Sequence, residues 1–460
     1  MATRGEATPT TERGSRSATE VDAGSGAADP GGSGARPRWA RGGPDSWWAP
    51  QHRDGLMLVL SAAVSAAIGM VFWVLAARLF EQGVVGVNSA ALSAITLLAS
   101  ASHLNLGNAL LRFVPVSVRP GALVAGCFAV GLGWGAVVGL VFGVGAGIWA
   151  PDLVATLGHP ALIAFYVVAV PVWTAFVLQD SALTAIKRVP LVLVENVAFA
   201  VLKIVLLVLA SWSGMAFGIA GGTLAATALV VVVVVAYLSR ALRRQPAPEH
   251  VQPATARDLA GFLGADYAGN VAWQSATFGL PLLVIALTDP AGAAVYGIAW
   301  QITYCLYLVA SSMGKAMVVH SAGGDSDAIV RARRGMDRKT MTLVLPGALV
   351  LAAGSSLILS VFGRAYAEGG AVLLALLALS AIPNVVSNSA LWEARVRRTR
   401  SVQFGLPAAT SAAVFAGTLV LVPAIGLTGV GWAWLGAQTV AAAVILVHRR
   451  VRRPAPAATG

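Results

Sequence analysis

Three polar side chains recur at intervals of four residues in one otherwise apolar stretch of the chain. Asp266, Asn270 and Gln274 follow this spacing, with Trp273 beside them. Four residues make slightly more than one helical turn, so the three groups would share a helix face. An ionisable group at membrane depth usually faces a cavity or a partner. The stripe therefore predicts a cavity face that binds a sugar, a pyrophosphate partner or a coupling cation. The alternative is that Asp266 lies near the membrane surface and is merely hydrated.

Two further ionisable residues, Glu195 and Lys203, share a second apolar stretch. Eight residues span about 12 Å along a helix axis, which is too far for the two to pair. Lys203 lies deep in its stretch and needs a carboxylate, a cavity or the anionic headgroup of a substrate. For Glu195 we expect an ion pair with Lys187 or Arg188, and for Asp180 a pair with a loop arginine.

Three more residues are candidates for contact with a substrate. Arg112 could bind a pyrophosphate bidentately, although an arginine there also satisfies the charge rule for cytoplasmic loops. Asn88 begins a face of small hydroxyl side chains, for which we favour packing between helices. Gln301 lies in a stretch where cavity lining and packing are equally balanced interpretations.

No motif in the chain indicates catalysis, a cofactor or a metal. There is no Walker A sequence, and the six histidines have no metal-ligand spacing. Both cysteines fall in apolar stretches, as free buried cysteines do. The net charge of +12 lies in short loops between apolar stretches, so we expect membrane lipids and not nucleic acid as partners. The chain is predicted not to be an enzyme.

Composition places the 460-residue chain in a membrane. It is 57% hydrophobic and 11% charged, whereas a soluble domain carries about 25% charged residues. Apolar runs of about 20 residues recur throughout, which predicts an all-α polytopic membrane protein with about 12 transmembrane helices. The expected spans are 55–79, 84–105, 121–147, 160–184, 189–211, 214–238, 260–287, 292–317, 340–362, 368–392, 402–422 and 425–447.

Loop charge sets the orientation. Loops after odd-numbered spans hold only Arg78 and Arg364, and nearly all other lysines and arginines fall on the opposite side. The positive-inside rule therefore places both termini in the cytoplasm. Between two expected spans, we favour a solvated loop over an amphipathic helix for residues 322–338. The predicted domains are a disordered cytoplasmic tail (1–52), an N-lobe (53–238), a cytoplasmic linker (239–259), a C-lobe (260–447) and a basic cytoplasmic tail (448–460).

The C-terminal half repeats the N-terminal half at an offset of about 208 residues. Glu81 matches Asp289, the run 181–183 matches 389–391, and Lys187 matches Arg395. Six spans per half give both halves the same topology, so a pseudo-twofold axis along the membrane normal relates two six-helix lobes. Such duplicated bundles are typical of transporters.

Several stretches resemble bacterial polysaccharide exporters. They are Ala77–Gly86, Ser89–Leu98, Leu106–Phe113, Leu359–Glu368 and Gly426–Gly431. The family comprises the lipid-linked oligosaccharide flippases, of O-antigen type, of the multidrug/oligosaccharidyl-lipid/polysaccharide (MOP) exporter superfamily. The resemblance implies a MATE-like fold with a central cavity, in a bacterial plasma membrane. It also implies flipping of an undecaprenyl-pyrophosphate-linked glycan by alternating access, with the glycan polymerase or glycosyltransferases of the same pathway as candidate partners.

Two other branches of the superfamily share this fold and remain alternatives. One is a cation-coupled multidrug exporter, for which Asp266 is the fair candidate carboxylate. The other is a lipid II flippase, which is disfavoured because its Arg-Asp pair in the first span has no counterpart between Gly55 and Ala77. A membrane-embedded glycan polymerase is disfavoured because every expected outer loop is short.

The predicted topology can be tested with single cysteines introduced by substitution. Cysteines in place of Gly158 and Ala291 should react with a membrane-impermeant thiol reagent on intact cells, since both positions are expected outside. A cysteine in place of Pro246, in the predicted cytoplasmic linker, should react only after the cells are opened. Labelling of the Pro246→Cys chain on intact cells would contradict the orientation.

Overall fold

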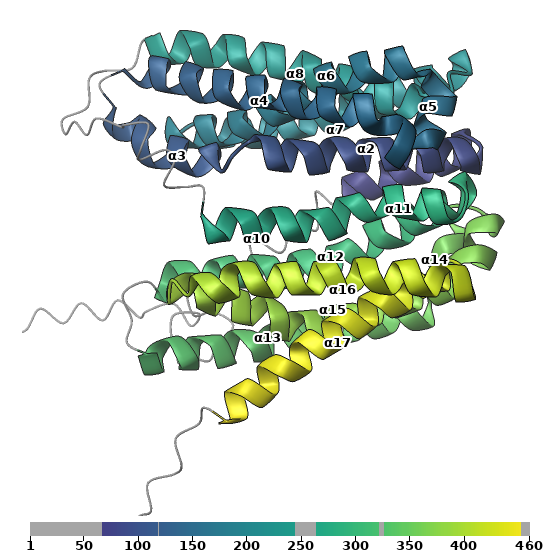
Figure 1. Cartoon of the computed structure of the whole chain (residues 1–460). Helices are drawn as coiled ribbons and strands as arrows, with labels where there is room; N and C mark the ends of the chain where they lie inside the picture. Colours follow the sequence, from purple (N-terminus) through teal and green to yellow (C-terminus); the bar gives the residue numbers. More distant parts are fainter. Residues whose placement is uncertain (1–66, 118, 244–263, 322–325, 452–460) are drawn as a thin grey trace, which may run out of the picture.

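The computed structural model describes residues 67–117, 119–243, 264–321 and 326–451, and every regular element in these ranges is a helix. Ten of the described helices are long and apolar enough to cross a membrane. The predicted tail at 1–52, positions 452–460 of the predicted C-terminal tail (448–460) and positions 244–259 of the linker lie outside the described residues. Positions 448–451 of that tail are helical. Figure 1 shows the helices of the N-terminal half gathered on one side and those of the C-terminal half on the other. The chain is thus an all-α, multi-pass membrane protein.

The helices of the first half follow the predicted spans closely. They are a helix at Ala67–Leu79, α2 (Gln82–Ser102), α4 (Pro120–Trp149), α6 (His159–Ala185), α7 (Val189–Ser213) and α8 (Gly218–Arg243). Two short helices that the sequence did not indicate, α3 (Leu106–Phe113) and α5 (Pro151–Leu157), lie in the connections.

The second half repeats this order with one interrupted and one divided span. The seventh span consists of α10 (Ala265–Gln274), a π-helical turn (Ser275–Gly279) and α11 (Leu280–Leu287). The ninth divides into α13 (Ser326–Ala353) and α14 (Ser355–Ser360). The remaining spans are α12 (Pro290–Ser321), α15 (Arg364–Val396), α16 (Arg400–Ile425) and α17 (Thr428–Val451).

The prediction of a loop at 322–338 is wrong, because α13 is already helical from Ser326. Helical spacing separates two faces of this segment. Ile329, Arg333 and Met336 are buried, whereas Arg331 and Arg334 are exposed. Arg333 forms ion pairs at its buried position, so a residue counted as a loop charge is part of the helix packing.

The duplication is visible in the turns that end α6 and α15. Lys187 and Arg398 adopt left-handed backbone conformations there, with φ of 60° and 55°. In each turn the next residue's N–H donates to a carbonyl five residues earlier at 2.8 Å. These are the same helix-ending turn, 211 residues apart. The structural partner of Lys187 is therefore Arg398 and not Arg395, because the sequence match drifts by three residues along the fourth span.

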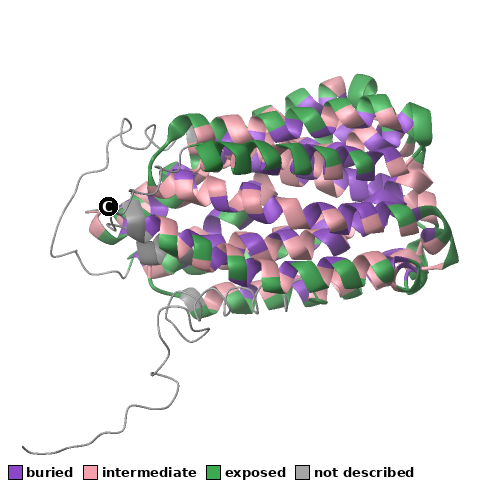
Figure 2. Cartoon of the chain, turned by 90° about the horizontal axis from the view of Figure 1, so that it is seen from below, coloured by how far each residue is buried: buried purple, intermediate pink, exposed green. Residues whose placement is uncertain are grey.

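Large apolar side chains cover the outer faces of the helices. Val141, Ile148, Val232 and Leu357 are all more than half exposed. Figure 2 shows such exposed positions along the outside of the bundle, with buried positions between the helices. An apolar exterior of this extent suits contact with lipid tails and not with water.

The closest approach between the two halves is between α2 and α12 at the ends where both helices begin. We call this end of the bundle the arginine-poor end, because Arg78 and Arg364 are its only lysines or arginines among the described residues. A Cβ atom on Gly86 would overlap the carbonyl of Pro290, and one on Gly297 would overlap the Ser89 hydroxyl. Glycine at these positions lets the two helix backbones touch.

Asn88 fastens α2 to the start of α8 within the N-terminal half. Its buried Nδ2 donates to the Ala216 carbonyl at 2.7 Å and to the Val84 carbonyl at 2.8 Å, and its Oδ1 accepts from the Ala220 N–H at 2.9 Å. All hydrogen-bonding groups of the amide are thus engaged by backbone. The side chain serves interhelical packing in this structure.

Asn88→Ala should destabilise the folded protein substantially. The substitution leaves the Ala216 carbonyl and the Ala220 N–H unpaired at a buried site, at about 1–3 kcal/mol for each group. Thermal unfolding of the protein in detergent measures the effect. Thr96→Ala on the same helix is the control, because its hydroxyl bonds only the Leu92 carbonyl of its own helix at 2.9 Å. Equal melting temperatures for the two variants would contradict the assigned role of Asn88.

Candidate functional site

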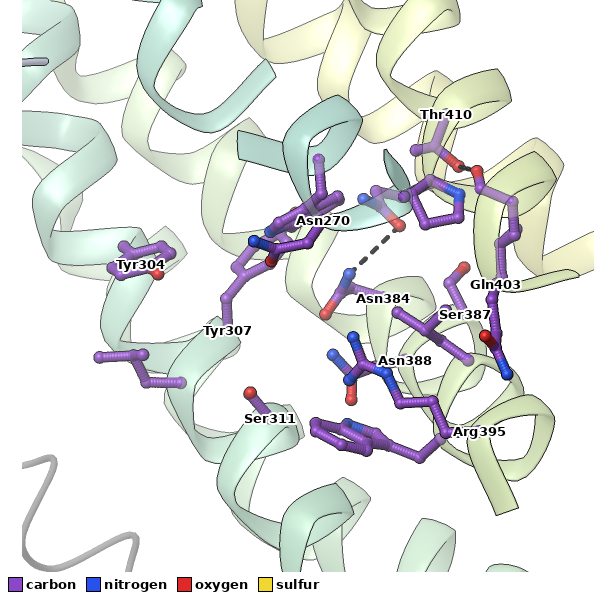
Figure 3. A pocket seen from close by; sticks show the side chains of 18 residues that line it. Asn270, Tyr304, Tyr307, Ser311, Asn384, Ser387, Asn388, Arg395, Gln403 and Thr410 are labelled. Atoms are coloured by element: carbon purple, nitrogen blue, oxygen red, sulfur yellow. Dashed lines mark hydrogen bonds between the residues drawn. The ribbon is translucent and has the colours of Figure 1, made fainter. Parts of the chain in front are cut away.

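A cavity of about 130 Å³ lies inside the C-terminal half, among α10, α12, α15, α16 and α17. Figure 3 shows its lining side chains converging from these helices. The polar lining residues are Asn270, Ser311, Asn384, Ser387, Asn388, Arg395, Gln403, Thr410 and Gln438. The aromatic ones are Trp273, Tyr304, Tyr307 and Trp392. A cavity of this size holds several water molecules or one sugar ring.

Most of the polar lining is amide or hydroxyl, and it is incompletely hydrogen-bonded. Asn384 donates to Gln438 Oε1 at 3.4 Å, which is the dashed contact in Figure 3. Five buried lining atoms have no partner in the protein: Asn384 Oδ1, Ser387 Oγ, Asn388 Oδ1, Trp392 Nε1 and Gln438 Nε2. An unmet buried group costs about 1–3 kcal/mol, so such a group is normally paired with water or a ligand. The set includes both donors and acceptors.

The charge at the cavity comes from Arg395. This residue lines the cavity, its Nε lies 2.6 Å from Asp266 Oδ1, and its guanidinium carbon lies 4.1 Å from the centre of the Trp392 ring. No carboxylate lines the cavity. Asp266 retains 44% side-chain exposure, so solvent weakens its attraction for Arg395. The cavity therefore presents neutral polar groups, aromatic faces and one guanidinium.

The three polar residues predicted to share one face of the seventh span contact three different parts of the structure. Asn270 lines the cavity, Asp266 pairs with Arg395, and Gln274 donates to Ser100 Oγ of α2 in the other half at 3.2 Å. Each four-residue step turns about 40° beyond a full rotation, so Gln274 lies about 80° around the helix from Asp266. The spacing placed the three residues on one side of the helix but not in one site.

Lys203 lies midway along α7, between two aromatic rings. Its ammonium nitrogen is 4.7 Å from the centre of the Phe72 ring and 5.1 Å from that of Phe199. No ion pair joins it to a carboxylate among the described residues. Of the three partners considered for this residue, the carboxylate is thus absent from the part of the chain that the structure describes.

Among the described residues, neither Glu195 nor Asp180 forms the expected ion pair with a lysine or arginine. Lys187 and Arg188 are exposed, whereas Glu195 is 5% exposed and neither of its carboxyl oxygens has a hydrogen-bond donor. The short turn between α6 and α7 reverses the chain and brings Glu195 beside Asp180. The neighbouring Gln179 amide is fully buried, and both its oxygen and its nitrogen are unpaired.

The other candidates lie outside the cavity. Arg112 is exposed at the end of α3, 5.4 Å from the centre of the Phe113 ring, and Gln301 is half-buried on α12. The sequence analysis missed Asn384, Ser387 and Asn388. Their spacing of three and four residues places them on one face of α15, which is the signal that could have found them.

The described residues contain no group of three or more histidine, cysteine or acidic side chains that could hold a metal ion. The cavity lining, with one arginine and no carboxylate, is equally unsuited to a cation. The chemistry open to this site is hydrogen bonding, aromatic contact and attraction of an anion.

Comparisons with solved structures identify the fold. The chain is similar to an inward-facing multidrug resistance MATE family transporter of the MOP superfamily, with a TM-score of 0.66 and 14% identity over 86% of this chain and 97% of the other. The chain is also similar to the outward-facing conformation of such a transporter, with a TM-score of 0.58 and 15% identity over 90% of this chain and 97% of the other. No family model and no curated protein matches the sequence. The chain therefore has the MATE-like fold that the family resemblance implied.

A third structure has the same fold and a different polarity in its pocket. It is a MOP superfamily transporter from Pyrococcus furiosus, with a TM-score of 0.61 and 14% identity over 90% of this chain and 97% of the other. The reverse polarity of its binding pocket is described as suggesting a different function. A shared fold thus leaves the polarity of the pocket open, and function has to be argued from the residues of each site.

Lys203→Met should leave the amount of inserted, folded protein unchanged or increase it. A lysine near the bilayer centre costs about 2.5–3.5 kcal/mol, whereas its contacts with the two rings recover about 0.5–2 kcal/mol. Yield and thermal stability in detergent measure the outcome. Lys187→Met, at an exposed turn, is the control and should change neither quantity. A marked loss of folded Lys203→Met protein would reveal an acidic partner for the lysine.

Proposed function

We propose that the chain is a membrane transporter that works by alternating access and carries a lipid-linked glycan from the cytoplasmic to the outer leaflet. The two lobes touch closely at the arginine-poor end, where Gly86 and Gly297 allow backbone contact. The positive-inside rule assigns this end to the outside. The lobes also touch toward the other end, where Tyr267 donates to the Ala101 carbonyl and Gln274 donates to Ser100 Oγ at 3.2 Å. A cytoplasmic pathway for the substrate would open when these contacts between α10 and α2 break.

The observation that supports a glycan as the substrate is the set of five unpaired polar atoms around the C-lobe cavity. A sugar hydroxyl both donates and accepts, so adjacent hydroxyls can satisfy amide oxygens and N–H groups together. The Trp273 and Tyr307 rings, with centres 5.9 Å apart, supply apolar faces for the C–H side of a sugar ring. Ordered water occupies such a cavity between substrates and is displaced when hydroxyls replace its hydrogen bonds.

The position of Lys203 favours a substrate whose lipid carrier is anionic. The pyrophosphate of a lipid-linked glycan must cross a low-dielectric region, where a cation is worth far more than in water. Lys203 lies at this depth and lacks a carboxylate partner among the described residues. We propose that it meets the pyrophosphate while the sugars occupy polar sites such as the C-lobe cavity.

The second candidate is a cation-coupled multidrug exporter, and two observations favour it. The solved structures that the chain resembles include multidrug resistance transporters. The N-lobe also contains two neighbouring acids, the buried Glu195 and the half-buried Asp180, with the unpaired Gln179 amide beside them. An acidic pair of this kind can bind a cation or a proton, which would couple export to an ion gradient.

Transport in liposomes should distinguish the two candidates. The purified protein should flip an undecaprenyl-pyrophosphate-linked oligosaccharide, and Asn384→Leu with Gln438→Leu should slow flipping about tenfold through lost cavity hydrogen bonds. Asn196→Leu is the matched control, because this amide of α7 bonds only its own helix at 2.8 Å. Failure to flip the glycan, together with cationic-drug efflux that Glu195→Gln abolishes, would establish the second candidate in place of the first.

A further inference from the structure

At the arginine-poor end, Arg78 spans the boundary between the two lobes. It lies in the last turn of the Ala67–Leu79 helix, and its exposed side chain reaches the end of α14 in the C-lobe. Nε donates to the Val361 carbonyl at 2.9 Å, and Nη2 donates to the Ser360 carbonyl at 3.3 Å. No other side-chain hydrogen bond in the described part of the chain joins the lobes at this end.

The acceptors are suited to an arginine. Carbonyls at the end of a helix carry the negative end of its dipole and retain a free lone pair. The Ser360 carbonyl also accepts from the Gly363 N–H at 3.2 Å. A guanidinium presents several N–H groups in a fixed plane, so one side chain can bind two neighbouring carbonyls. Gly363, with φ of 143°, reverses the chain directly after these residues and leaves their carbonyls facing the N-lobe.

Beneath Arg78 the two lobes share one apolar core. Phe72, Ala76 and Val85 of the N-lobe pack in the same cluster as Val295 and Phe362 of the C-lobe. Opening this end would separate these side chains and break both hydrogen bonds of Arg78 together. The hydrogen bonds therefore exist only while the lobes are in contact here.

We propose that Arg78 is a latch that holds the outer ends of the lobes together while the protein is closed to the outside. The latch rests on the proposed alternating access, and it adds a device that biases the equilibrium between its two states. Breaking the latch should raise the population of the outward-open state about fivefold, because an exposed charged hydrogen bond contributes less than a buried one.

The test measures how often the outer end opens. Val85 is fully buried between the lobes, so a cysteine at Val85 reacts with an impermeant thiol reagent added outside only when they separate. In the full chain with Cys305→Ala, the Val85→Cys labelling rate should rise about fivefold on Arg78→Ala. Arg78→Lys, which keeps the charge but offers a single donor nitrogen, should give a smaller rise.

Two controls separate opening from unfolding. Arg364 is the other arginine of this end, but it pairs with Glu368 of its own helix at 2.6 Å, so Arg364→Ala should leave the labelling rate unchanged. Native Cys127 is buried in the N-lobe core and should stay unreactive in every variant. A Val85→Cys rate that does not change on Arg78→Ala, or that rises equally on Arg364→Ala, overturns the latch.

A cross-link tests alternation separately from the latch. A Cβ built on Gly83 lies 3.7 Å from Pro290 Cβ across the lobes, which is within the range for a disulfide. Oxidised Gly83→Cys/Pro290→Cys protein should be locked at this end and should transport nothing until it is reduced. Transport by the locked protein would contradict alternating access, whereas the labelling result alone decides the role of Arg78.

Discussion

Hydrocarbon offers no hydrogen-bonding partner, so each polar side chain within the membrane has to be satisfied by the protein or by whatever enters it. Most of the chain meets this constraint locally. Thr174 and Thr223 donate to carbonyls of their own helices at 2.8 Å, and Asn88 engages backbone groups of two helices. Buried polar groups that lack a hydrogen-bond partner are therefore candidates for binding water or a ligand, because most other polar side chains find a partner in a neighbouring backbone group.

Buried polar groups without a partner occur at several places in the C-lobe, and the ones at its cavity differ in kind from those in the N-lobe. The C-lobe cavity has neutral amides and hydroxyls, whereas the N-lobe has the acidic pair of Asp180 and Glu195 and, further along α7, Lys203. Since the lobes share one helix order, this contrast is not imposed by the fold. Under the proposed function, the C-lobe cavity would bind the sugars and Lys203 of the N-lobe would meet the charge of the carrier.

The sequence predicted the helices well because hydropathy and loop charge are local properties. The prediction failed at α13, where Arg333 lies inside the bundle. One of its two acidic partners, Glu393 at 3.0 Å, is 60 positions away in the sequence and gives no local signal. The prediction failed at Glu195 for the same reason, because the turn after α6 brings Asp180 beside it. Asn384 and Gln438 escaped notice because neutral amides give no signal in hydropathy or charge.

The charges around Arg333 have two roles: they contribute to the orientation of the spans in the membrane, and they join helices of the C-lobe. Arg333 bonds Asp337 at 2.9 Å and Glu393 at 3.0 Å, and Arg449 approaches both acids at 3.8–3.9 Å. Burial raises the pKa of Asp337 more than the neighbouring arginines lower it, so desolvation offsets much of the attraction between the groups.

The benefit of this cluster is therefore geometric more than energetic. It joins α13, α15 and α17 at the arginine-rich end of the C-lobe. An alternating-access transporter needs lobes that move as bodies, and an apolar core alone would allow helices to slide at the ends where lobes separate. Arg333 and Arg449, which belong to the end that the positive-inside rule assigns to the cytoplasm, thus also hold the ends of three helices together beside the cavity.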